Sequence, residues 1–175
     1  MLVEKVMQAI RDVPDFPKPG ILFKDITPIM MNPQLSEEIL VALEEKYRNK
    51  GIDKIAGIES RGFLFGYPLA IRLGIPFILI RKQGKLPYNK SSLEYDLEYG
   101  TSTIEMHTDA IGAGDRVLIH DDLLATGGSA AAAAQLIKQS GGEIAGFDFL
   151  VQLDFLQGQE KLAPYSPSIQ AIVNY

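Results

Sequence analysis

The sequence predicts an α/β fold, in which helices flank a mostly parallel, twisted sheet. Short apolar runs of the kind that form buried strands alternate with amphipathic stretches that suit helices. The connections between them are mostly short and contain glycine, and no internal repeat or long linker interrupts the order. Such alternation implies right-handed crossovers and parallel strands. Ligands of these sheets bind at the carboxyl ends of the strands, so the loops that follow strands are where function is expected.

The individual elements follow from periodicity and punctuation. The expected strands are residues 54–59, 75–80, 101–107, 116–121 and 143–153, and the expected helices are one at the amino terminus and then 36–50, 62–73 and 127–140. Ser36 can cap the second of these helices, and Gly74 closes the third. Residues 12–28 contain four prolines and are expected to be irregular, and residues 82–100 show no clear period.

Composition bounds the class of protein. The 175 residues are expected to form a single domain, 1–175, with an ordinary hydrophobic fraction of 46%. Without cysteine there can be no disulfide or thiolate zinc site, which fits a reducing cytoplasm. A net charge of −5 disfavours a dedicated nucleic-acid binder. No apolar run reaches membrane-spanning length, and the amino terminus does not look like a signal peptide.

The most specific motif is the segment Val117–Ser129, VLIHDDLLATGGS. An apolar strand leads into a short loop, and the loop leads into a helix. Glycines at 127 and 128 let backbone N–H groups converge, and the helix amino terminus adds unpaired donors and a favourable dipole. A phosphate cradle is therefore expected, formed by residues Ala125, Thr126, Gly127, Gly128 and Ser129.

Asp121 and Asp122 would repel a phosphate, so they suggest that a neutral, hydroxyl-rich group comes next to it. Carboxylates accept hydrogen bonds well from ribose hydroxyls, and a nearby divalent cation would offset their charge. The simpler alternative is a helix cap in which an aspartate precedes a glycine-rich turn. The complete string closely resembles the signature with which type I phosphoribosyltransferases bind phosphoribosyl pyrophosphate (PRPP).

Four further strings extend the resemblance over nearly the whole chain. They are DFPKPGILFKDITP (15–28), AGIESRGFLFG (56–66), IRKQGKLP (80–87) and LEYG (97–100). In this order they resemble the adenine phosphoribosyltransferase family. The resemblance implies purine salvage, in which adenine and PRPP give AMP and pyrophosphate with Mg²⁺ bound beside PRPP. It also implies an amino-terminal hood at about 1–34 and a flexible loop at about 82–100.

For the purine, the resemblance implies recognition by residues Leu22, Phe23, Lys24 and Arg61. The backbone of Leu22 would read the 6-amino edge, and Phe23 would pack on the ring. Lys24 stands where the family commonly has arginine, which weakens any bidentate contact there. Read without the resemblance, a core contact under the amino-terminal segment is the favoured interpretation of Leu22 and Phe23.

For pyrophosphate, the implied residues are Ser60, Arg61, Arg81, Lys82 and Lys85. The resemblance also implies unusual peptide geometry at Glu59–Ser60. The basic residues supply the local positive field that an acidic protein needs for an anionic group. A strand-end ion pair at Arg61 and a solvated basic turn at 81–85 are the alternatives. In related enzymes the basic loop reaches the neighbouring subunit's active site, which implies a homodimer.

The resemblance makes Glu98 the candidate acid or base for the purine proton, and Tyr99 the residue that closes over the site. Glu105 is a competing carboxylate that ranks below Glu98. His120 is expected to pack or hydrogen-bond inside a strand, and His107 to lie at a strand end, neither with a role in catalysis.

Three other functions stay open. One is transfer to another purine base, and a second is a non-catalytic protein that senses PRPP. The third is an α/β module for some other sugar phosphate, which would leave the purine and hood strings unexplained. A dinucleotide site is disfavoured because Gly112-Ala-Gly114 lacks a third glycine and precedes its strand.

Overall fold

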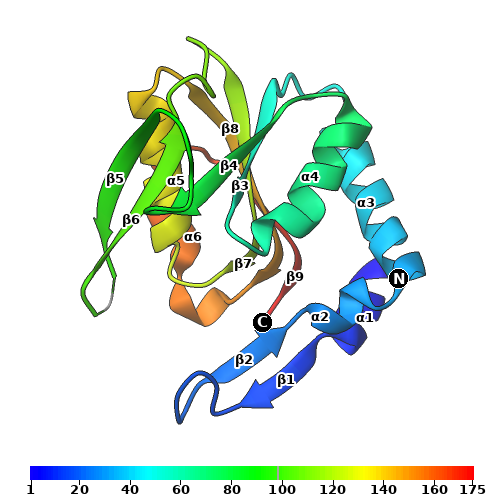
Figure 1. Ribbon diagram of the computed structural model, residues 1–175. Helices are drawn as coiled ribbons and strands as arrows, with labels where there is room; N and C mark the ends of the chain where they lie inside the picture. Colours follow the sequence, from blue (N-terminus) through cyan, green and yellow to red (C-terminus); the bar gives the residue numbers. More distant parts are fainter. Residues whose placement is uncertain (98) are drawn as a thin grey trace. The chain divides into compact units, whose positions relative to one another are not determined.

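The computed structural model describes residues 1–97 and 99–175 (Figure 1). The chain divides into two compact units, Met1–Lys46 and Tyr47–Tyr175. The α/β class with a mostly parallel sheet is confirmed in the second unit. The single domain expected for residues 1–175 stays a prediction. Among the residues described, no helix combines the length and the apolar character that crossing a membrane requires.

The first unit contains a helical part and a small hairpin. Its elements are α1 (Leu2–Ala9), β1 (Arg11–Pro14), β2 (Leu22–Asp25), α2 (Thr27–Met30) and α3 (Pro33–Tyr47), whose last residue belongs to the second unit. The expectation that residues 12–28 are irregular was wrong, because β1 and β2 pair antiparallel with Val13 opposite Phe23. Three of the four prolines fall at the end of β1 and in the connection, where no ladder N–H is needed, and Pro28 lies in the first turn of α2.

Helix α3 begins three residues earlier than its apolar stripe predicts. The side chain of Asn32 accepts a hydrogen bond from the N–H of Leu35 at 3.0 Å, so Asn32 provides the cap. Ser36, the expected cap, lies inside the helix and donates its hydroxyl to the carbonyl of Ile29 at 2.9 Å. Asparagine and serine are both good helix caps, and Asn32 is the cap because it directly precedes the first residue of α3.

The second unit is built on a seven-stranded sheet in the order β5-β6-β4-β3-β7-β8-β9. The strands are β3 (Lys54–Ile58), β4 (Phe77–Lys82), β5 (Lys90–Asp96), β6 (Thr101–His107), β7 (Arg116–Leu124), β8 (Glu143–Gln152) and β9 (Ile169–Asn174). β3 is parallel to both β4 and β7, and β8 is parallel to β7 and β9. β6 pairs antiparallel with β4 and with β5.

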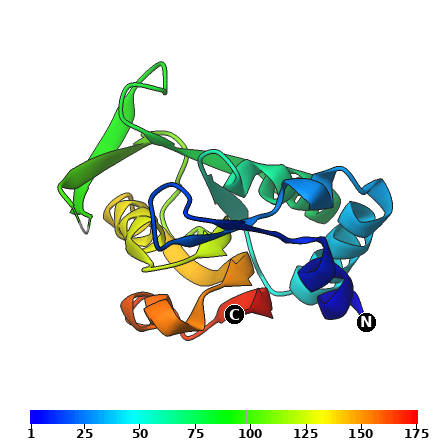
Figure 2. The same cartoon turned by 90° about the horizontal axis from the view of Figure 1, so that it is seen from below.

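Helices cover the two faces of this sheet. Helix α4 (Gly62–Leu73) packs on β3, β4 and β7, and α5 (Gly128–Gln139) packs on β5, β7 and β8 (Figures 1 and 2). A short 3₁₀ turn (Asp154–Leu156) and α6 (Gly158–Leu162) follow β8. The apolar residues of the central strands and the alanines of α5 form one buried cluster. Gly74 closes α4 with a left-handed φ of 68°, as the sequence predicts.

Three strands differ from their predicted form, and one of them, β9, was not predicted at all. β7 continues to Leu124, three residues beyond its expected end, so both aspartates lie within the strand. Residues 90–96 form β5, although 82–100 showed no clear period. Its signal is a weak alternation in which Leu93 and Tyr95 pack on the buried cluster while Glu94 and Asp96 are exposed.

Candidate functional site

The candidate site lies at the carboxyl ends of three parallel strands. β3 lies between β4 and β7 and is parallel to both. The strand that follows β3 in the chain, β4, pairs with one side of it, and the later strand β7 pairs with the other side. The loops after β3, β4 and β7 therefore share one edge, at the point where the strand order reverses. This is where open α/β sheets bind their ligands.

The glycine loop after β7 forms a hollow of about 90 Å³, lined by Asp121 and residues 123–130. Gly127 has a left-handed φ of 79° and precedes the first turn of α5. A Cβ at Gly127 would lie 2.6 Å from the carbonyl oxygen of Gly158, so the loop also packs on α6. At Gly128 a Cβ would meet nothing closer than 3.9 Å. The two glycines therefore differ, because Gly127 is needed for the fold and Gly128 leaves the hollow open.

Asp121 and Asp122 meet at the entrance to this loop. The backbone N–H of Asp122 donates to Oδ1 of Asp121 at 2.9 Å, and Oδ2 of Asp122 lies 2.8 Å from Nε of Arg61. Burial, and then the negative charge of Asp122, raise the pKa of Asp121 well above its ordinary value, and Arg61 offsets only part of this. The site thus contains one ion-paired carboxylate beside one that resists ionisation.

Glu59 lies at the end of β3 and binds two of the predicted pyrophosphate residues. Its side chain is 6% exposed and contacts Nε of Arg81 at 2.8 Å and Nζ of Lys85 at 3.1 Å. Burial raises the pKa of Glu59, but hydrogen bonds from Lys85, Arg81 and the backbone of Lys82 outweigh it, so the pKa is lowered. The unusual geometry expected next to it is present, since the Glu59–Ser60 peptide bond is cis.

The start of α4 brings Arg61 to this edge. A Cβ at Gly62 would lie 2.8 Å from the carbonyl oxygen of His120, so only glycine allows the helix to approach β7 this closely. Gly62 is therefore required for the packing of α4 on β7. Arg61 precedes the helix and is 43% exposed, which leaves part of its guanidinium facing solvent.

The segment after β4 connects back to the phosphate loop through β5. The hydroxyl of Tyr95 lies 3.2 Å from Oγ of Ser129. Tyr99 is 76% exposed, and Glu98, the predicted acid or base, lies outside the described residues. Glu105 is 3% exposed and accepts a hydrogen bond from the N–H of Gly84 at 3.1 Å, which supports its lower rank as a catalytic candidate.

Three of the four predicted purine residues, Leu22, Phe23 and Lys24, lie in the hairpin of the first unit, whereas Arg61 belongs to the second unit. Leu22 is 49% exposed at the start of β2. Phe23 packs edge-on against Phe16 with ring centroids 5.1 Å apart, and Lys24 binds Oδ1 of Asp12 at 2.6 Å. The hairpin therefore holds an aromatic pair beside an ion pair, and a role in purine binding stays a prediction.

Both histidines have the structural positions expected of them. His120 is fully buried in β7, and its Nδ1 lies 2.9 Å from Asp148, which also accepts the hydroxyl of Tyr47 at 2.6 Å. Burial, and then the charge of Asp148, raise the pKa of Tyr47. His107 ends β6, and its Nε2 lies 2.8 Å from the carbonyl oxygen of Pro87.

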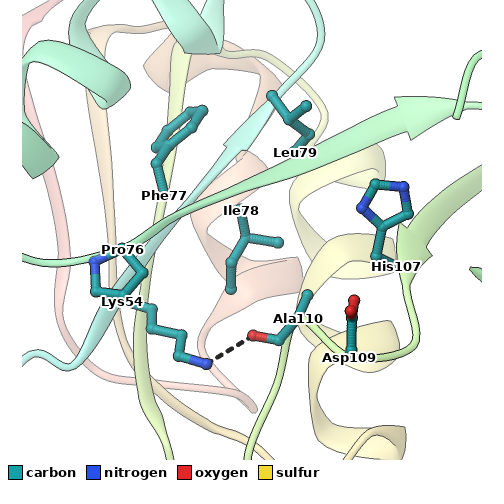
Figure 3. A pocket seen from close by; sticks show the side chains of 8 residues that line it. All are labelled: Lys54, Pro76, Phe77, Ile78, Leu79, His107, Asp109 and Ala110. Carbon is teal, nitrogen blue, oxygen red and sulfur yellow. Dashed lines mark hydrogen bonds between the residues drawn. The ribbon is translucent and has the colours of Figure 1, made fainter. Parts of the chain in front are cut away.

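A second hollow of about 310 Å³ lies near the amino-terminal ends of β3 and β4 (Figure 3). Two of its polar side chains, Lys54 and His107, are already bonded within the protein. Lys54 donates to the carbonyl oxygen of Ala110 and contacts Asp115, each at 2.8 Å. Although it is larger than the glycine-loop hollow, it lies away from the strand ends that carry the predicted ligands. The smaller hollow therefore remains the candidate site.

The sequence did not identify three contributors to the site. The sequence predicts unusual peptide geometry at Glu59 but no ion pair, although Glu59 lies between strand β3 and the predicted pyrophosphate residues Ser60 and Arg61. Tyr95 lies in a segment interpreted as loop, where the alternation over 93–96 was the available signal. Gly158 follows all the strings that carry the resemblance, and nothing local connects it with Gly127.

A sheet edge that combines a phosphate-sized glycine loop, paired aspartates and clustered cations suits a protein that binds a phosphorylated sugar. The family model of the phosphoribosyl transferase domain matches residues 26–168. An adenine phosphoribosyltransferase from Cytophaga hutchinsonii is 54% identical over 175 residues, covering 100% of this chain and 97% of the relative. The chain belongs to the adenine phosphoribosyltransferase family.

Solved structures agree with this assignment. The crystal structure of adenine phosphoribosyltransferase from Thermoanaerobacter pseudethanolicus has a TM-score of 0.94 and 46% identity, with 99% of each chain covered. The enzyme from Saccharomyces cerevisiae, complexed with an imino-altritol bisphosphate and adenine, has a TM-score of 0.91 and 41% identity, with 98% of each chain covered.

Proposed function

We propose that this protein transfers the phosphoribosyl group of PRPP to N9 of adenine, giving AMP and pyrophosphate. The observation that carries the proposal is the shared sheet edge, where the glycine loop, the two aspartates and the basic residues gather in a chain of this family. Displacement at C1′ develops positive charge on the ribose and negative charge on the leaving group. The site has groups of the sign needed at each end.

The glycine loop is proposed to hold the 5′-phosphate, through the backbone N–H groups of residues 125–129 and the hydroxyls of Thr126 and Ser129. Asp121 and Asp122 would hold the ribose 2′ and 3′ hydroxyls. The contact with Arg61 fixes the carboxyl group of Asp122, and the backbone N–H of Asp122 fixes that of Asp121, so oxygens of both residues can accept hydrogen bonds from the two hydroxyls. The pair can therefore bind a diol, whose two hydroxyls can both donate hydrogen bonds.

Pyrophosphate is proposed to bind Ser60, Arg61 and the basic set Arg81, Lys82 and Lys85. In the structure Arg81 and Lys85 contact Glu59, and Arg61 contacts Asp122. These carboxylates orient the cations in the absence of the ligand. An incoming pyrophosphate, with more negative charge than a carboxylate, can share or replace those contacts.

The purine is proposed to be recognised by Leu22, Phe23, Lys24 and Arg61, as the family resemblance implies.

Glu98 would take or hold the imidazole proton, and Tyr99 would cover the site from water. Glu98→Gln keeps shape and removes basicity, so the single-turnover rate should fall by about 10²–10⁴-fold, with little change in KM for PRPP. A near-normal rate would remove Glu98 from the chemistry.

Magnesium is proposed to enter with PRPP. Two adjacent carboxyl groups, one of them hard to ionise, suit a cation, because its charge would lower the cost of ionising Asp121. Asp121 and Asp122 would hold the ion directly or through water. When bound, magnesium neutralises charge on the leaving group.

We also propose a homodimer in the cytoplasm. Large apolar side chains are exposed along α4 and β4, namely Leu64, Tyr67, Ile71 and Leu79. The ring of Tyr67 packs on Phe77 with centroids 5.7 Å apart, which joins the two elements into one apolar surface. An exposed apolar surface of this kind suits the interface of a twofold dimer.

The dimer would let the basic loop complete a partner's site, as related enzymes do. An Arg81/Lys85 double variant mixed with an Asp121/Asp122 double variant tests this, because a heterodimer would contain one intact site. Partial recovery of activity after subunit exchange is expected. If activity does not recover although mass measurements confirm subunit exchange, each site is built from one chain. The contacts of Arg81 and Lys85 with Glu59 of the same chain would agree with that outcome.

The assay that tests the function supplies PRPP, Mg²⁺ and each common nucleobase in turn. Adenine should be used up to about 10⁴-fold better than hypoxanthine or guanine, because a site that reads the 6-amino edge leaves polar groups unpaired against a 6-oxo base. Comparable rates with hypoxanthine would favour transfer to another purine. PRPP binding without turnover of any base would favour a sensor.

A further inference from the structure

Tyr95 connects the segment after β4 with the glycine loop. Its hydroxyl lies 3.2 Å from Oγ of Ser129, and its ring packs on the buried cluster. A Cβ at Gly128 would lie 3.9 Å from the ring. Tyr95 therefore stands beside the first two residues of α5, Gly128 and Ser129, which line the proposed phosphate site.

The chemistry of the two hydroxyls gives this contact a direction once a phosphate is present. A serine hydroxyl has one proton to donate and can accept hydrogen bonds from others. Phosphate oxygens act as acceptors, so Ser129 must donate its proton to the phosphate. Its oxygen then accepts the proton of Tyr95, and the chain runs from Tyr95 through Ser129 to the phosphate. Such chains strengthen each bond and fix the serine rotamer.

We propose that Tyr95 is a positioning residue for the 5′-phosphate, acting through Ser129. The inference rests on the proposed function and adds a residue from outside the glycine loop. It also has a reciprocal consequence. If the contact of Tyr95 with Ser129 strengthens phosphate binding by some factor, phosphate binding strengthens the attachment of β5 to α5 by the same factor. Occupation of the phosphate site would thus stabilise the β5–β6 hairpin.

Tyr95→Phe removes only the hydroxyl and tests the proposal. Binding of AMP and of adenosine, which lacks the phosphate, is measured by calorimetry. AMP should bind about 3–10-fold more weakly to the variant, the usual effect of one hydrogen bond, while adenosine binding is unchanged. KM for PRPP should rise with kcat nearly constant. Tyr165→Phe is the matched control, because Tyr165 packs on the same buried cluster.

A double-mutant cycle separates positioning from packing. In a Ser129→Ala background the hydroxyl of Tyr95 has lost its partner, so Tyr95→Phe should then change AMP binding by less than about 2-fold. Hydrogen exchange gives a second measurement. AMP should slow amide exchange over residues 90–96 in the wild type, and less so in Tyr95→Phe.

Three results would overturn the role of Tyr95: an unchanged AMP affinity, an equal loss for adenosine, or a loss that persists in the Ser129→Ala background. Equal AMP protection of residues 90–96 in both proteins would count against the coupling. Failure of the proposed function looks different. A wild-type protein that binds AMP no better than adenosine would contradict the phosphate site itself.

Discussion

Glu59 and Asp121 are carboxyl groups at the same edge of the sheet, in opposite electrostatic environments. The register that pairs Gly57 with His120 brings them to adjacent strands at the same edge of the sheet. Glu59 lies between Arg81 and Lys85, and its pKa is lowered. Burial and the nearby charge of Asp122 raise the pKa of Asp121. The leaving-group end thus has more cations than carboxylates, whereas the ribose end has two carboxyl groups beside one cation.

This difference shows how one acidic protein can form a site for a ligand that has an anionic pyrophosphate at one end and neutral ribose hydroxyls at the other. At the leaving-group end a carboxylate orients cations that the ligand later uses. At the ribose end two carboxyl groups lie side by side, and burial and mutual repulsion disfavour the ionised form of Asp121. Hydrogen bonds from hydroxyls, or a bound cation, would reduce this destabilisation. Sites commonly give up stability for such arrangements. The comparison can be tested by changing one end at a time.

The largest effect is expected from Gly128→Val, which changes neither carboxyl group. A Cβ there would meet its nearest neighbours, Thr126 and Tyr95, only at the ordinary contact distance of 3.9 Å, so the variant should fold, and its larger side chain would narrow the phosphate hollow that Gly128 lines. Binding of AMP and PRPP should be lost, while pyrophosphate binding at the other end persists. Calorimetry with each ligand measures this. Gly127→Val is a poorer test because its Cβ would clash with Gly158.

If Gly128→Val bound AMP normally, the phosphate would lie elsewhere and the two ends would need to be redefined. If it lost pyrophosphate as well, with a normal melting temperature, the ends would not be independent.

Glu59→Gln should have the next largest effect, confined to the leaving-group end. Without the charge of Glu59, Arg81 and Lys85 lose the partner that orients them. KM for PRPP and the inhibition constant of pyrophosphate should each rise by about 10-fold, the scale of one charge-assisted hydrogen bond. Steady-state kinetics with pyrophosphate as product inhibitor measures both.

Glu143→Gln is the control for loss of charge. Glu143 is exposed at the amino-terminal end of β8, away from the carboxyl ends of the strands where the site lies. Tighter pyrophosphate binding in Glu59→Gln would mean that Glu59 competes with the ligand and does not prepare the cations for it.

Asp121→Asn should change stability and binding in opposite directions. A carboxyl group with a raised pKa keeps its proton in the folded state after the unfolded state has lost it, so stability falls as pH rises above 3.8, the ordinary value. Asparagine does not titrate. At pH 7 the variant should be more stable by about 1 kcal/mol, and the gain should shrink as pH falls toward that value.

Chemical denaturation at several pH values measures the gain, and binding of ribose 5-phosphate should weaken in the same protein. Asp122→Asn is the contrasting variant, because it breaks the contact with Arg61 and should not stabilise. A loss of stability in Asp121→Asn would show that Arg61 already balances both aspartates.

The smallest effect concerns salt. Arg81 and Lys85 are partly exposed, so their attraction for pyrophosphate is open to screening. Backbone donors in the glycine loop act at short range. Raising NaCl from about 0.05 M to about 0.5 M should weaken pyrophosphate binding a few-fold more than AMP binding. Equal salt dependence would indicate that side-chain charge dominates at both ends.

Much of this architecture follows from the sequence alone. The periodic strands and helices of the second unit, the glycine that closes α4 and the loop before α5 all depend on local chemistry, so they could be predicted within a few residues. The phosphate motif could be placed because its parts are contiguous in the chain. Glycine, hydroxyl and carboxylate side chains there are the ones that a sugar phosphate needs.

Only the tertiary structure decided the rest. The hairpin β1–β2 and strand β5 form because partners elsewhere in the chain complete their ladders. The contact of Glu59 with Arg81 joins residues 22 positions apart, and that of Tyr95 with Ser129 joins residues 34 apart. A carboxyl group's pKa likewise depends on burial and on the charges placed beside it. The sequence determines which groups are present, but the sign of their interactions depends on which of them the folded chain brings within a few ångströms.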